Sequence, residues 1–193
     1  VNTAPASAPF LNRLSGPNRV IVTATRTGNE ISFTHFGTYL ARAFQDEEAD
    51  LDQDDQVSLL EAFLTASAQV REFYDAQGRL LTEHALIDDN GDGKGTPADW
   101  FRGVRAVRTA TDDSAVDGIR AHQFHLILSP QEQALPMQVR GQRDSIEQSI
   151  AALRDRKEKL PEENYYSDLE KLLLQLARIY QTNAPSASSP SPK

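Results

Sequence analysis

Short apolar runs and longer amphipathic stretches alternate along the chain up to Ser129. The clearest run is RVIVTA, from Arg19 to Ala24, and an unbroken β-branched run of this length is typical of a strand buried on both faces. Apolar residues at helical spacing predict a helix from about Thr34 to Phe44. A second broad apolar face predicts a helix from Val57 to Phe73, which Gly78 ends.

Three further segments complete the expected sheet. LLTEHALI (Leu80 to Ile87) and FHLIL (Phe124 to Leu128) are apolar enough to be strands, and Val1 to Thr3 is the end of another. The polar stretch from Ala106 to Ala121 reads as a loop. The pattern therefore predicts an α/β fold over residues 1–129, with an open, mostly parallel sheet flanked by helices.

The composition changes at Pro130, where two amphipathic stretches begin that are separated by Pro161. They predict an antiparallel helical hairpin over residues 130–182, whose apolar face is a possible surface for a protein partner. Residues 183–193 (NAPSASSPSPK) read as a disordered tail or a linker. The apolar positions of the hairpin are Val139, Ile146, Ile150, Leu153 and Leu160, followed by Tyr165, Leu169, Leu172, Leu176 and Ile179.

Charge and composition exclude several classes of function. A net charge of −8 argues against nucleic acid as a partner, because phosphate binding requires clustered Lys and Arg. The absence of cysteine excludes disulfides, zinc thiolate sites and thiol catalysis. No apolar run is long enough for a membrane span. Because Val1 stands inside what reads as a strand, we expect the chain to be a piece of a longer protein.

Residues Asp50 to Glu61 match the calcium-loop template. Carboxylates stand at positions 1, 3 and 5, a backbone carbonyl is available from Gln56 at position 7, and Glu61 at position 12 can bind bidentately. The departure is Asp55, where the template has a glycine with positive φ. The alternative is an acidic lead-in that stabilises the dipole of the following helix. The carboxylate ligands before Glu61 are Asp50, Asp52 and Asp54.

A second acidic loop, Asp88 to Gly95, is a weaker candidate for a metal. Asp88, Asn90 and Asp92 have the D-x-N-x-D-G spacing, but the loop reaches an Asp at position 12 instead of a Glu. A glycine-rich turn closed by Asx hydrogen bonds explains the same residues.

No catalytic constellation is apparent from the residues alone. The serines lack a G-x-S-x-G elbow, and the histidines lack a third zinc ligand at defined spacing. We therefore interpret the histidines as structural or surface residues; they are His35, His84, His122 and His125.

Three segments nevertheless resemble motifs of one enzyme family. The segment APASAPF (Ala4 to Phe10) is similar to the motif A-C-x-S-G-x-F. Residues 23–30 are similar to the motif T-A-x-x-x-x-E, and residues 82–88 are loosely similar to S-H-V-x-x-Y-G-D. In these segments the chain resembles the C-terminal half of the caspase-like cysteine peptidases, above all the legumain-like ones. The resemblance to large, modular bacterial members implies a periplasmic or exported location and a missing N-terminal half that carries the catalytic His.

The departure from this family decides the expected function. Pro5, or Ala4 under a one-residue shift, occupies the position of the nucleophilic Cys, and neither side chain can replace a thiolate. The resemblance therefore implies a catalytically inactive homologue that acts as a binding or scaffold module. The first acidic loop adds the expectation that Ca²⁺ stabilises this module. Two alternatives remain: a hydrolase with Ser7 as nucleophile and an upstream His, or a plain calcium-dependent interaction protein.

Overall fold

The computed structural model describes residues 1–109 and 115–183, which form two compact units with a mixed α/β composition. The first unit ends at Ser129 and the second begins at Pro130. The elements of the first unit are α1 (Ala8–Leu14), β1 (Ile21–Thr23), α2 (Phe36–Ala43), η1 (Glu47–Ala49), α3 (Leu59–Ala76), β2 (Leu86–Asp88), β3 (Thr96–Pro97), η2 (Ala98–Trp100), β4 (Phe101–Arg102), β5 (Arg105–Ala106) and α4 (Ile119–His122).

The sheets of the first unit are small, and their named strands pair antiparallel. One has the order β1-β2-β3, with Thr23 opposite Leu86, and the other is the pair β4-β5. The expected mostly parallel sheet is not formed by the described residues, because β2 begins beside the end of β1 and runs back along it. Over residues 1–109 and 115–183, parallel pairing is limited to a bridge in which Asn2 N donates to Val22 O (2.8 Å) and Ala24 N donates to Asn2 O (3.0 Å).

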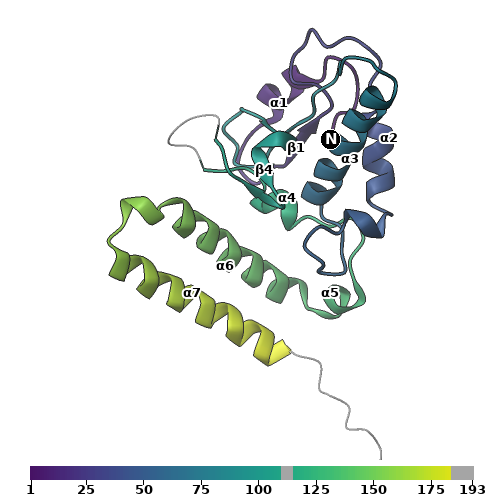
Figure 1. Ribbon diagram of the computed structural model, residues 1–193. Coiled ribbons are helices and arrows are strands. Elements are labelled where there is room, and N and C mark those ends of the chain that lie inside the picture. Colours follow the sequence, from purple (N-terminus) through teal and green to yellow (C-terminus); the bar gives the residue numbers. More distant parts are fainter. Residues whose placement is uncertain (110–114, 184–193) are drawn as a thin grey trace, which may run out of the picture. The chain divides into compact units, whose positions relative to one another are not determined.

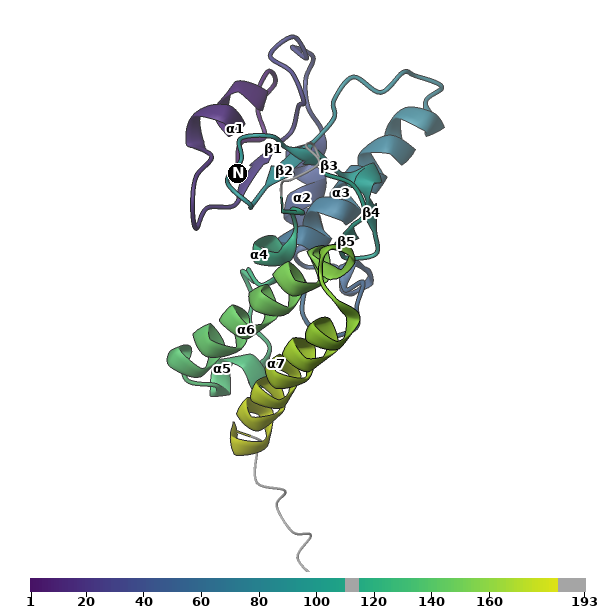
Figure 2. The same cartoon turned by 90° about the vertical axis from the view of Figure 1, so that its left-hand side faces the viewer.

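Helices cover both sides of this sheet. In Figure 2, α1 lies on one side of β1, and α2 and α3 lie on the other. Val22 and Ile87, opposite each other in the sheet, are both fully buried against the helices. Phe36 and Phe63 bring α2 and α3 together, with ring centroids 6.1 Å apart in an edge-on arrangement. These contacts make one apolar core within the first unit.

The helix α3 has clear signals at both ends. Ser58 accepts the backbone N–H of Glu61, and the Glu61 side chain accepts that of Ser58, which is a capping box. Gly78 adopts φ +61° just beyond the helix, a conformation that favours glycine and ends helices. The sequence therefore predicts this helix well.

Two predicted strands differ from the structure. Phe124 to Leu128 is not a strand, since only His125 forms a bridge, to Ser58, and the side chains of Phe124, Leu126 and Ile127 are exposed. In the other predicted strand, Leu80 to Ile87, only the last two residues belong to β2. Before them, His84 N donates to a side-chain oxygen, Glu30 Oε2 (3.2 Å), and not to a neighbouring strand. Of the predicted loop at 106–121, the last residues form α4, and 110–114 lie outside the described residues.

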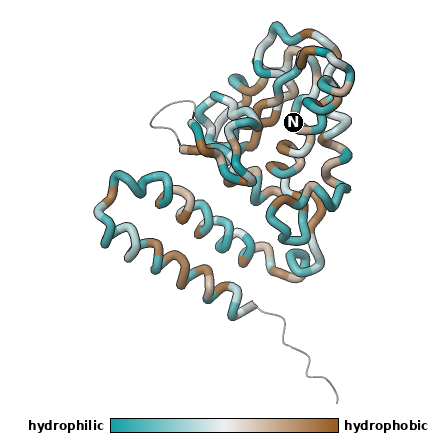
Figure 3. Tube along the Cα trace, in the orientation of Figure 1, coloured by the Kyte–Doolittle hydropathy of each residue, from teal (hydrophilic) through white to brown (hydrophobic). Residues whose placement is uncertain are grey.

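The second unit is a helical hairpin, preceded by a short helix (Figure 1). Its elements are α5 (Pro130–Ala134), α6 (Met137–Asp155), η3 (Lys157–Lys159) and α7 (Glu162–Asn183). Apolar and polar segments alternate along α6 and α7 (Figure 3). Arg143 interrupts the apolar pattern, and its guanidinium pairs with Glu132 and Asp144. Burial lowers the pKa of Arg143, but these two carboxylates outweigh it and raise the pKa. Residues 184–193 of the predicted tail lie outside the described residues.

Candidate metal centre

The first acidic loop folds around the side chain of its first residue. Asp50 accepts hydrogen bonds from Asp54 N (3.1 Å) and Asp55 N (3.0 Å), and Asp54 Oδ1 accepts one from Gln56 N (2.9 Å). As a result, carboxylate oxygens of Asp50, Asp52 and Asp54 lie within 4.8 Å of one another. Converging oxygens from positions 1, 3 and 5 are the donor set that Ca²⁺ prefers.

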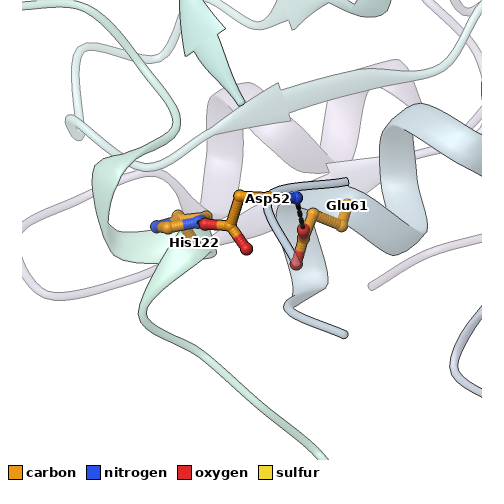
Figure 4. A group of neighbouring side chains, drawn as sticks. All are labelled: Asp52, Glu61 and His122. Atoms are coloured by element: carbon orange, nitrogen blue, oxygen red, sulfur yellow. Dashed lines mark hydrogen bonds and ion pairs between the residues drawn. The ribbon is translucent and has the colours of Figure 1, made fainter. Parts of the chain in front are cut away.

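Glu61, the twelfth residue of the loop, is buried beside Asp52 (Figure 4). Its Oε1 accepts hydrogen bonds from Leu51 N (2.8 Å) and Asp52 N (3.3 Å). Its Oε2 accepts hydrogen bonds from Ser58 N (2.8 Å) and Ser58 Oγ (2.7 Å). The carboxylate therefore joins the first residues of the loop to the start of α3, next to the oxygens that would hold a cation.

The backbone of this loop turns at two positions with positive φ. Gln53, at position 4, has φ +62°, and Asp55, at position 6, has φ +66°. Asp tolerates this left-handed conformation better than most residues, although at a cost relative to glycine. The second acidic loop turns in the same way with glycines, since Gly91 has φ +82° and Gly93 has φ +75°. Asp55 therefore takes the conformation for which the template uses glycine.

His122 and Glu61 form a second group that shares Asp52 with the three aspartates, although the sequence gives no sign of the histidine. The Nε2 atom of His122, at the end of α4, lies 2.9 Å from Asp52 Oδ2. Ligand atoms of His122, Asp52 and Glu61 lie within 4.8 Å of one another. The oxygen donors fit a hard cation such as Ca²⁺. The imidazole of His122 is not a typical calcium ligand, and its contribution is the contact with Asp52.

The charge of the loop is partly uncompensated. Burial raises the pKa of Asp54, and the neighbouring charges of Asp52 and Glu61 add to this effect, while His125 and the hydrogen bond from Gln56 oppose it. A bound cation would remove this repulsion, because it favours the ionised carboxylates. The fit of the residues to a divalent cation therefore has an electrostatic as well as a geometric basis.

The second acidic loop is closed by its own hydrogen bonds. The buried Asp88 accepts from Gly91 N (2.9 Å) and Gly93 N (3.1 Å), and Asp92 Oδ1 accepts from Lys94 N (2.8 Å). Asn90 Oδ1 accepts from Asp92 N (2.8 Å). Within the described ranges, none of these residues belongs to a group of three acidic or histidine ligands. The local geometry is that of an Asx-stabilised turn.

Asp89 and Asp117 bind the second loop to α4. Asp117 accepts hydrogen bonds from Asp89 N (2.9 Å), Asn90 N (3.1 Å) and Thr96 Oγ1 (2.6 Å). Asp89 accepts from the backbone at the start of α4, including Gly118 N (2.9 Å) and Ala121 N (2.9 Å). Burial raises the pKa of both carboxyls, that of Asp117 to about 7, although the hydrogen bonds oppose the shift.

The loop from Ala4 to Ser7 follows the segment that pairs parallel with β1. Ser7 is fully buried, and its Oγ accepts hydrogen bonds from Ala24 N (3.0 Å) and Thr25 N (3.2 Å). The same oxygen lies 3.2 Å from Thr25 Oγ1. A hydroxyl held in this way connects the loop to β1, and its burial argues against the alternative in which Ser7 is a nucleophile. Ala4 and Pro5 offer no reactive group.

Comparison of the chain with models of protein families, with curated proteins and with solved structures gives no match. None of the described helices is long and apolar enough to cross a membrane.

Replacing Asp55 tests the strain in the first loop. Asp55→Gly and Asp55→Ala both remove the carboxylate, but only glycine accepts φ +66° without the steric cost of a Cβ atom. We expect the Gly variant to have the higher free energy of unfolding, by about 1 kcal/mol, in urea denaturation followed by the fluorescence of Trp100. Equal stability of the two variants would show that residue 55 is not held in the left-handed region.

Asp117 makes the stability of the first unit depend on pH. The pKa of Asp117 is raised from its ordinary value of 3.8 to about 7. Between these two pH values the folded state keeps a proton on Asp117 that the unfolded state has lost. The free energy of unfolding contributed by this group therefore falls as the pH rises from about 4 to about 7. With a chelator present, the fall in the free energy of unfolding between acidic and mildly basic pH should be roughly 4 kcal/mol greater in the wild type than in Asp117→Asn. Identical pH profiles would contradict the assignment.

Proposed function

We propose that this chain is a calcium-stabilised, non-catalytic binding module related to the caspase-like peptidases. The observation that carries the calcium part is the arrangement of the first acidic loop. Three carboxylates converge, the backbone turns at Gln53 and Asp55, and Glu61 lies beside Asp52. The backbone carbonyl of Gln56 is the further ligand that the template supplies, while its side-chain Oε1 accepts from Ser129 N (3.0 Å).

Stabilisation would follow from the position of this loop between η1 and α3. A cation held by Asp50, Asp52, Asp54 and Glu61 would fix the chain before the helix that carries much of the core. Its binding energy would add to the folding energy to the extent that the unfolded chain lacks the site. The second loop contributes to the module as a structural turn.

The non-catalytic part rests on the loop from Ala4 to Ser7. In the family that the chain resembles, this loop carries the nucleophile at the carboxyl end of a strand. Here Asn2 forms a parallel bridge with Thr23, and α1 lies in the connection between these two residues. This arrangement is consistent with a loop at the carboxyl end of a strand. Pro5 and Ala4 cannot attack a carbonyl carbon, and the Ser7 hydroxyl accepts hydrogen bonds from Ala24 N and Thr25 N, just after β1. A binding role therefore fits these residues better than hydrolysis.

Calcium titration of the full chain tests the first part. We expect heat of binding in calorimetry, and an increase in stability of about 2.7 kcal/mol when free Ca²⁺ is a hundredfold above the dissociation constant. Asp54→Asn keeps the acceptor for Gln56 N but loses one ligand charge, so its calcium affinity should fall roughly tenfold or more.

The matched control for this titration is Asp75→Asn, which removes an exposed carboxylate from α3 outside the loop and should bind Ca²⁺ like the wild type. Absence of binding by the wild type, or equal affinities of the Asp54→Asn variant and the wild type, would overturn the calcium proposal.

Assays with peptidyl-Asn and peptidyl-Arg substrates, with and without Ca²⁺, test the second part. We expect no turnover above the buffer rate and no labelling by a fluorophosphonate, because the loop presents no accessible nucleophile. Labelling of the wild type at Ser7, or turnover that disappears in Ser7→Ala, would overturn the non-catalytic assignment.

A further inference from the structure

A cavity of about 270 Å³ opens in the first unit where β1 ends and β2 begins. Its lining residues come from the segment after β1, from α2 and α3, and from the chain between Leu81 and Trp100. The volume exceeds the roughly 150 Å³ of an engineered cavity that binds benzene, so it suffices for one aromatic side chain with a small polar group. Its apolar wall includes Phe36, Val70, Leu81 and Trp100.

Two arginines and a histidine also line this cavity. Arg26 follows β1, with a side chain that is 58% exposed and an Nε atom 3.4 Å from Glu30 Oε1. Arg71 projects from α3 and is exposed, and the structure gives it no ion pair among the residues that it describes. Both guanidinium groups are therefore accessible to a ligand in the cavity.

Glu30 orients the histidine of the cavity. His84 Nδ1 lies 2.8 Å from Glu30 Oε1, and Glu30 Oε2 accepts from His84 N (3.2 Å) and Arg26 N (3.0 Å). This arrangement uses one ring nitrogen of His84 and leaves Nε2 for a ligand. The carboxylate of Glu30 is thus occupied in positioning Arg26 and His84.

Neither of the two acidic residues that line the cavity forms an ion pair with Arg71 in the part of the chain that the structure describes. Glu83 is buried, and its carboxylate accepts hydrogen bonds from His35 N (2.9 Å), Phe36 N (2.9 Å) and Tyr74 Oη (3.2 Å). Its charge is therefore compensated by the start of α2. Asp99 is exposed, and solvent screens it.

We propose that this cavity binds a carboxylate attached to an apolar or aromatic group. The planar guanidinium of Arg71 or Arg26 forms paired hydrogen bonds with a carboxylate, and an amide of the same shape offers only one acceptor oxygen. The apolar part of the ligand packs on the wall that contains Trp100. The chemistry is shared by a free acid and by the C-terminal residue of a peptide, and it does not depend on the calcium loop.

Trp100 is the only tryptophan of the chain, so its fluorescence reports on this cavity. Titration with N-acetyl-phenylalanine should give a saturable change, and titration with N-acetyl-phenylalaninamide should give none. Arg71→Gln should weaken binding of the acid roughly tenfold or more, since it removes a charge-assisted pair. Arg42→Gln, which changes an exposed arginine of α2 that does not line the cavity, should bind like the wild type.

The possible results separate the source of the ligand from the existence of the site. Tighter binding of an acetylated tripeptide ending in phenylalanine would support a peptide C-terminus, and equal or weaker binding would support a free acid. No saturable change at millimolar acid, equal responses to acid and amide, or unaltered affinity of the Arg71→Gln variant would overturn the proposal. Asp54→Asn should bind the acid normally, which separates this result from the calcium proposal.

Discussion

The irregular parts of the first unit depend on buried carboxylates that accept hydrogen bonds from the backbone. Glu61, Glu83, Asp89 and Asp117 are all buried, and each accepts at least two hydrogen bonds from backbone N–H groups. An isolated buried charge is very unfavourable, and several N–H donors compensate for much of the lost solvation. With strands of only two or three residues, the sheet alone fixes little of the chain. These carboxylates hold the loops that the sheet does not.

One series of these contacts connects the two acidic loops. Asp117 fixes the backbone of Asp89 and Asn90, Asp89 holds the start of α4, and α4 places His122 against Asp52. The second loop, which lacks a suitable twelfth ligand, therefore supports the first through a short helix. This coupling explains why a glycine-rich turn far from Asp52 in the sequence is relevant to the geometry of the candidate cation site.

Local periodicity was sufficient for the longer helices, but not for the short helix α4 or for the sheet. The spacing of apolar residues predicts α2, α3 and the two long helices of the hairpin, because one face of each is repeated every three or four residues. Arg19 to Ala24 contains β1, but an apolar run does not specify the direction of its neighbour, which depends on where the connection after α3 returns. Phe124 to Leu128 has the composition of a strand and only an isolated bridge at His125. His122 and Asp117 meet their partners across long sequence separations, so no spacing identifies them.

The calcium template predicted which carboxylates of the first loop converge, but Glu61 has a role that the template does not describe. Its two oxygens already accept four hydrogen bonds, which compensate for its burial without a cation. A cation that binds to Glu61 must therefore share or displace those hydrogen bonds. The net binding free energy is the difference between the loop with the cation and the loop with its hydrogen bonds alone. The uncompensated charge around Asp54 favours the cation, whereas the hydrogen bonds of Glu61 favour the loop without a cation. The calcium affinity of the loop depends on this balance, and not on the number of carboxylates alone.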